Sequence, residues 1–144
     1  MASKLYGNVL KAAFNKEIDF DSDTIKVALV SSSYTPNQDT HDYWDDVVAN
    51  EVTGTGYTAG GATLASKSVT YDGATNTLTF DAADVTWSSS TITARYAVVY
   101  DDSGATNGQK ALLGYYDFTT DRASSNGDFT IRWNTAGMFT ATVG

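Results

Sequence analysis

The chain contains no cysteine, and His41 is its only histidine. The absence of cysteine excludes disulfides and thiolate metal ligands. With a single histidine, a metal site would have to be built from carboxylates, and no serine lies in the Gly-x-Ser-x-Gly setting of a nucleophile. The sequence therefore predicts no metal, no cofactor and no catalytic residues, and we expect that the protein is not an enzyme.

Positive charge and long apolar runs are also scarce. Nine Lys and Arg residues stand against seventeen Asp and Glu residues, which gives a formal net charge of −8. Binding to a phosphate backbone depends on clustered Lys and Arg, so we expect no nucleic-acid partner. No segment has the length of a membrane span, and residues 1–14 do not have the pattern of a secretory signal. We expect a soluble protein that is made in a cytoplasm and has no membrane partner.

Short apolar or alternating stretches, separated by Gly, Asn, Asp and Ser, fill most of the chain. This spacing is typical of antiparallel sheets and not of βαβ units. The predicted fold is mainly β: an antiparallel, jelly-roll-like β-sandwich of about eight to ten strands with a short N-terminal α-helix. The 144 residues correspond to one domain, 1–144. The expected strands are 24–30, 66–71, 77–80, 85–87, 93–100, 111–118, 128–133 and 138–143.

The stretch 94–101 is nearly all apolar, with Arg95 as the polar interruption. Such a run predicts a central strand that is covered on both faces. Upstream, Val85 and Trp87 alternate with polar residues, which predicts a half-exposed strand joined to the central one by a serine-rich turn.

Residues 4–15 are the best helix candidate, because their polar side chains recur at spacings of three and four. Ser3 is a candidate cap for this helix, and Gly7 weakens it. Its wide apolar face is expected to pack against the sheet of the same chain or against a neighbouring subunit. A second short helix is expected over 40–48, with Thr40 as its cap and His41 as a lone surface or capping histidine.

Two stretches resemble ligand-binding motifs, but each lacks residues that the motif requires. Residues 19–23 have the carboxylate spacing of a calcium loop, but Thr24 and Val30 occupy the positions that need glycine and glutamate. An acidic turn is the preferred interpretation. Residues 51–64 include a loose dinucleotide fingerprint, but no helix is predicted after its glycines, and Ala62 occupies the lysine position of a P-loop. This stretch is interpreted as a glycine-rich connection with positive φ and close backbone approach.

Three longer stretches carry a resemblance to a known family: 18–30 after a short helix, 49–70, and 80–102. Together they resemble small tailed-phage virion proteins that are called capsid decoration or cement proteins. The resemblance covers most of the chain and consists of glycines and core strands, without a catalytic motif. It implies an oligomeric virion component on a capsid surface, and it transfers no functional residues to this chain.

The leading hypothesis is a non-enzymatic capsid decoration (cement) protein. It would be a homotrimer on the capsid exterior that binds the phage major capsid protein and stabilises the shell. The alternative is a tail-associated or fibre-associated module that recognises a glycan or receptor through exposed aromatic rings. A cluster of exposed rings would favour the binding module, whereas buried rings would favour the structural protein. The candidate interface residues are Leu5, Tyr6, Val9, Phe14, Tyr43, Trp44 and Tyr57.

Overall fold

The computed structural model describes residues 2–144. Within them, antiparallel strands dominate and there is one short α-helix, so the predicted β-sandwich-like fold class is confirmed. The elements are β1 Ala2–Leu5, α1 Val9–Phe14, β2 Ile25–Val30, η1 Trp44–Asp46, η2 Val48–Asn50, β3 Ala62–Thr63, β4 Ser68–Asp72, β5 Thr77–Asp81, β6 Val85–Ser90, β7 Thr93–Asp101, η3 Asn107–Gln109, β8 Leu112–Ala123, β9 Gly127–Ile131 and β10 Phe139–Thr142.

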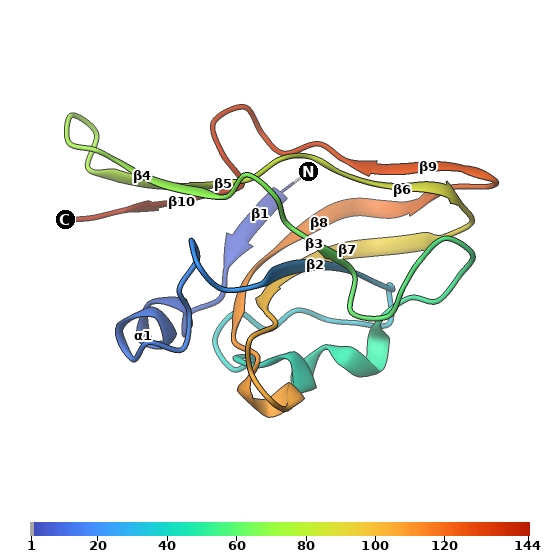
Figure 1. The fold of residues 1–144 in the computed structure, drawn as a ribbon, viewed down its shortest axis with the longest axis horizontal. Helices are drawn as coiled ribbons and strands as arrows, with labels where there is room; N and C mark the ends of the chain where they lie inside the picture. Colours follow the sequence, from blue (N-terminus) through green and yellow to red (C-terminus); the bar gives the residue numbers. More distant parts are fainter. Residues whose placement is uncertain (1) are drawn as a thin grey trace.

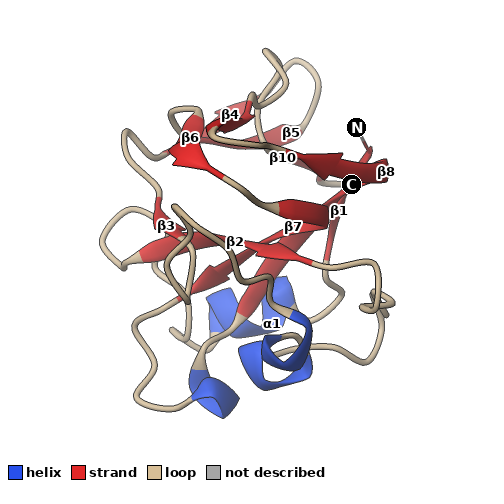
Figure 2. Cartoon of the chain, turned by 90° about the vertical axis from the view of Figure 1, so that its right-hand side faces the viewer, coloured by secondary structure: helices blue, strands red, loops and turns tan. Residues whose placement is uncertain are grey.

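A five-stranded sheet in the order β1-β8-β7-β2-β3 forms the middle of the molecule. A second layer lies above it and consists of two smaller sheets, β10-β5-β4 and β6-β9 (Figure 1). The 3₁₀ helices gather on the opposite side of the five-stranded sheet (Figure 2), whereas the buried side of α1 joins the core between the layers. The sheet is therefore covered on both faces.

Each face of the five-stranded sheet has its own hydrophobic core. Side chains alternate between the two faces along a strand. Val27 and Val99 therefore point into the core between the two layers, whereas Ala28 and Val98 point into the core between the sheet and η1. These four side chains are fully buried. Strand β7 is thus a central strand with both faces covered, as its apolar run predicts.

The N-terminal segment differs from the prediction. The helix predicted over about 4–15 is limited to α1, because Ala2–Leu5 forms β1 and pairs with the edge of β8. Between them, the backbone N–H of Gly7 donates to the carbonyl of Gln38 at 2.8 Å. Asn8 takes the N-cap position of α1 in place of Ser3, with no side-chain hydrogen bond. The edge of the sheet provides hydrogen-bond partners for the backbone of this segment. A longer helix would have contained Gly7, which destabilises a helix interior.

The second predicted helix, 40–48, is also different. The chain forms two short 3₁₀ turns, η1 and η2, and Tyr43 takes the N-cap position of the first in place of Thr40. Within residues 2–144, no helix has the length and apolar character that crossing a membrane requires.

Candidate functional site

The sheet β10-β5-β4 projects beyond the rest of the molecule, on the side where α1 lies (Figure 1). We call this three-stranded sheet the arm. Residues directly opposite each other in its ladders share a face, and they form two apolar rows. The inner row is Val69, Phe80 and Phe139, and the outer row is Tyr71, Leu78 and Ala141. The alternate residues of the three strands are Ser, Thr and Asp, so the arm has one apolar and one polar face.

The inner part of the apolar face is anchored to the body of the molecule. The ring of Phe80 meets Phe20 edge-on with centroids 5.7 Å apart, and Phe139 packs against Tyr116 at 5.1 Å. The hydroxyl of Tyr116 donates to the carbonyl of Met138, just before β10. These contacts fix the arm at one end.

Away from these contacts, the apolar face lies in the open. Tyr71 of the outer row is 57% exposed, and Val143, which follows β10, is 53% exposed. Val69, the member of the inner row on the edge strand β4, is 37% exposed. Leu78 and Ala141, between them, are only half-buried. Large apolar side chains that gather on one side of a projecting sheet are typical of a surface that another molecule covers.

The arm is also almost free of charge. Residues 68–81 contain only Asp72 and Asp81 as charged side chains, and residues 133–144 contain none, although 18% of the whole chain is charged. Uncharged surface is inexpensive to desolvate, and it avoids repulsion when a chain of net charge −8 approaches another copy of itself or another acidic protein. The arm is therefore suited to burial in a contact.

A second exposed apolar surface belongs to α1. Phe14 is 86% exposed and Leu10 is 50% exposed, whereas Val9 and Ala12 on the other side of the helix are buried. One side of the helix thus packs against its own chain, which is the first of the two predicted arrangements. The exposed ring of Phe14 remains available for the second, a contact with a neighbouring subunit. Of the candidate interface residues, Phe14 is the one with a largely exposed side chain.

Three of the other candidates lie inside the chain. Tyr6 is 1% exposed and shares a hydrogen bond of 2.9 Å with the hydroxyl of Tyr34, and its burial raises the pKa of its phenol. The indole of Trp44 stacks on the ring of Tyr100 at a centroid distance of 4.3 Å. Val9 is buried against the core between the layers.

The remaining candidates are half-buried, and each has a partner within the chain. Leu5 packs against the core from β1. The hydroxyl of Tyr43 donates to Glu17 at 2.8 Å. The hydroxyl of Tyr57 donates to Glu51 at 2.7 Å and accepts from the backbone N–H of Leu29 at 3.0 Å. The aromatic candidates therefore do not gather into one flat exposed cluster.

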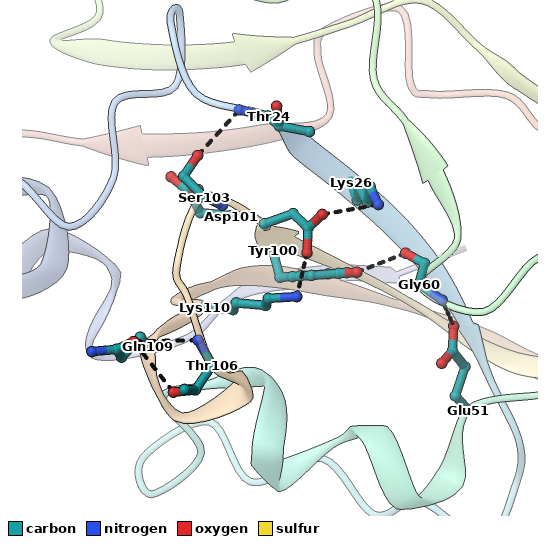
Figure 3. Close-up of polar contacts among 11 residues, drawn as sticks. Thr24, Lys26, Glu51, Gly60, Tyr100, Asp101, Ser103, Thr106, Gln109 and Lys110 are labelled. Atoms are coloured by element: carbon teal, nitrogen blue, oxygen red, sulfur yellow. Dashed lines mark hydrogen bonds and ion pairs between the residues drawn. The ribbon is translucent and has the colours of Figure 1, made fainter.

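The glycine-rich connection is held by a polar network within the chain (Figure 3). Glu51 accepts from the N–H of Gly60 at 2.6 Å, and Tyr100 donates to the carbonyl of Gly60 at 2.7 Å. Gly61 has a φ of +82°, and a Cβ there would lie 2.0 Å from the carbonyl oxygen of Val27. The positive φ and close backbone approach expected from the sequence are both present, and strand β3 follows in place of a helix.

A second polar group lies beside this network. Asp102 accepts from Lys26 at 2.9 Å and from Lys110 at 2.7 Å, and both lysines lower the pKa of its carboxyl against the opposing effect of burial. Its neighbour Asp101 is 1% exposed, and its Oδ2 has no hydrogen-bond partner. Burial raises the pKa of the Asp101 carboxyl to about 6, and the negative charge of Asp23 acts in the same direction.

The predicted acidic turn forms at residues 19–23, where Asp23 accepts from the backbone N–H of Asp19 at 2.8 Å. Among residues 2–144, no group of three or more His, Asp or Glu side chains is placed to hold a metal ion. The Nδ1 atom of His41 lies 2.8 Å from the hydroxyl of Tyr34.

One open hollow of about 380 Å³ lies at the opposite end of the upper layer from the arm, along β8 and β9. Arg122, Asp128 and Arg132 contribute polar groups to it. Its two rings, Phe118 and Phe129, are buried and present no flat face to solvent.

Comparison of the chain with protein-family models, with curated proteins and with solved structures finds no match.

Sequence reasoning did not single out the arm residues Val69, Tyr71, Leu78, Ala141 and Val143. The signal available was their alternation with Ser and Thr, which predicts strands. The alternation does not reveal how far each strand lies from the body. That distance decides which apolar side chains stay exposed.

Proposed function

We propose that this chain is a non-enzymatic structural protein of a phage virion, a capsid decoration (cement) protein. It binds the outer surface of the shell through the major capsid protein and stabilises the shell. The observation that carries the proposal is the arm: an almost uncharged apolar sheet face that extends past the body and is left open at Tyr71 and Val143. The resemblance to decoration proteins that is expected from residues 18–30, 49–70 and 80–102 points to the same function, although the comparisons find no such match.

The burial of the aromatic candidates supports the structural protein over the binding module. Rings that stack on sugars need a flat face open to solvent beside polar groups. Trp44 is 3% exposed, and the most exposed rings, Phe14 and Tyr71, come from separate elements, α1 and β4. The hollow at Arg122 and Arg132 is the feature that favours a tail-associated or fibre-associated module, and binding of glycans there is the outcome expected of that alternative.

Charge supports a place on the outside of the shell. A homotrimer, as predicted from the sequence, carries a formal charge of −24, three times −8. Packaged DNA repels such a trimer at distances below about 10 Å at 0.1 M salt, where screening is incomplete. For the trimer, the exposed side of α1 with Leu10 and Phe14 offers an apolar surface that the arm does not use.

The test uses particles with and without the protein. An external cement protein adds its binding free energy to the resistance of the shell. Particles that lack it are expected to assemble but to release DNA at a lower temperature, and added purified protein is expected to restore them. Unchanged heat release in its absence contradicts the proposal.

The position is tested on intact particles. On the exterior, the protein is expected to be cut by added protease and to bind antibodies raised against it. Full protection from protease together with no antibody binding contradicts the exterior position and indicates an internal or tail location.

A further inference from the structure

Strand β4 is an open edge of the arm. It pairs with β5 on one side only, and all five of its residues are exposed. An open edge presents unpaired N–H and C=O groups, which are a template for pairing with another strand. Figure 2 shows β4 at the outer margin of the upper layer.

The usual protection of such edges is reduced here to one charged residue, Asp72, at the end of the strand. Strand β4 contains no proline and no lysine, and its register with β5 runs without a bulge from Ser68 to Asp72. The nearest lysine, Lys67, donates instead to the backbone carbonyl of Asp23 in the body. Natural proteins block open edges with charges, prolines or bulges unless the edge is meant to be paired.

The sequence of β4 complements itself about its central residue. In an antiparallel pair of two copies centred on Thr70, Val69 lies opposite Tyr71 of the second copy, and Ser68 lies opposite Asp72. Directly opposite residues share a face, so this register places apolar side chains beside apolar ones and opposes no two like charges. A shift by one residue would oppose Val69 to Thr70 and lose that match.

We propose that β4 pairs antiparallel with β4 of a second copy of this chain, with Thr70 on the twofold axis. The pairing joins two three-stranded arms into one six-stranded sheet with a continuous apolar face. It is a twofold contact, additional to any threefold ring. It goes beyond the proposed function, because it joins two copies and needs no shell.

The charge of β4 and its self-complementary register both indicate that its pairing partner is a second copy of the chain. An oppositely charged partner would select basic or acidic residues along the edge, whereas β4 carries only Asp72. A five-residue edge buries less than a standard interface of about 1,200–2,000 Å². The contact is therefore weak in dilute solution and grows in importance wherever copies are held close together.

Single cysteine variants test the contact directly, because the natural chain has none. Opposite residues of an antiparallel pair have Cα atoms about 4.5–5.5 Å apart, within the range that a disulfide bridges. Thr70→Cys is expected to form covalent dimers at concentrated protein under mild oxidation. The control is Thr140→Cys on β10, which lies in the same cross-strand row and on the same polar face, at the other edge of the arm.

The proposal predicts that Thr70→Cys dimerises at least about tenfold faster than Thr140→Cys, since a preformed pair raises the effective thiol concentration. Equal rates overturn it. A second experiment fixes the register: in a mixture of Val69→Cys and Tyr71→Cys proteins, the mixed dimer is expected to exceed both homodimers. Homodimers in excess overturn the twofold register.

A charge on the edge gives an independent readout. Thr70→Lys places two like charges opposite each other at the twofold axis, which opposes pairing. Chemical cross-linking of concentrated protein is expected to lose its dimer band in Thr70→Lys and to keep it in Thr140→Lys. A dimer band that survives Thr70→Lys overturns the pairing. Loss of the pairing with unchanged binding to shells would leave the proposed function standing, so the two failures are distinguishable.

Discussion

Strands β7 and β4 are both regular antiparallel strands, yet they lie in opposite surroundings. In β7, Val98 and Val99 are fully buried in two different cores, whereas all five residues of β4 are exposed. The body and the anchored inner end of the arm, with Phe80 and Phe139, therefore hold the interactions that make the chain fold, whereas the open part of the arm holds apolar surface that folding leaves uncovered. The difference indicates that stability and association are carried by separate regions, and substitutions in the two regions should separate these properties.

Val98→Asp is expected to have the largest effect. The carboxylate would be buried without a partner, at a cost on the order of several kcal/mol against a typical total stability of about 5–15 kcal/mol. The variant is expected to be unfolded or insoluble when circular dichroism is followed during heating. A soluble variant that melts cooperatively would show that β7 is not the central strand of the body.

Phe139→Ala tests the inner end of the arm. Phe139 is 3% exposed and packs against Tyr116. Loss of a buried aromatic ring costs about 3–5 kcal/mol, because it removes apolar burial and leaves a cavity. Urea unfolding is expected to show this loss. A change below about 1 kcal/mol would mean that the arm is not anchored as described.

Asp101→Asn tests a buried charge in the body. The carboxyl of Asp101 has a pKa of about 6 when folded and an ordinary value of 3.8. Its contribution to stability is therefore complete below the ordinary pKa and is lost as pH rises through about 6. Asparagine does not ionise, so the variant should lose less stability than the natural chain over this interval. Urea unfolding at several pH values measures the difference, and identical pH profiles would contradict the buried carboxyl.

Tyr71→Ser is expected to have the smallest effect on stability. The ring lies at the outer end of the arm, and its hydroxyl bonds only Asn76. Surface changes of this kind stay within about 0.5 kcal/mol, so urea unfolding should hardly change. Binding to shells is expected to fall. Thr140→Ser, at an exposed position on the polar face of the same arm, is the matched control, which should keep shell binding. Equal loss in both variants would contradict a specific role of the arm's apolar face.

The sequence predicts the body better than the arm. The apolar run that includes Val98 indicates a strand covered on both faces, and the structure places it so. The prediction of a glycine-rich connection is also confirmed, because Gly61 lies so close to the backbone of Val27 that a Cβ atom would not fit. Both features follow from local pattern and steric demand, which a single sequence contains.

The rest depends on long-range contacts. Lys4 and Leu5 belong to the predicted helix, 4–15, but they join β8 in a sheet as part of β1, because the open edge of β8 satisfies their backbone groups. Trp44 was a candidate for an interface, but Tyr100, far along the chain, provides the ring on which it stacks. Likewise, Tyr71 and Phe139 belong to similar alternating strands, and only the position of the body decides that one is exposed and the other buried.

Amide hydrogen exchange of the protein, free and bound to shells, tests the division between body and arm most directly. In the free protein, β7 should exchange slowly and β4 quickly, because exposed edge amides lack partners. On binding, protection is expected to rise in 68–81 and 138–143 and to stay unchanged around the hollow at Arg122 and Arg132. Protection that appears at the hollow while the arm stays unprotected would contradict the account.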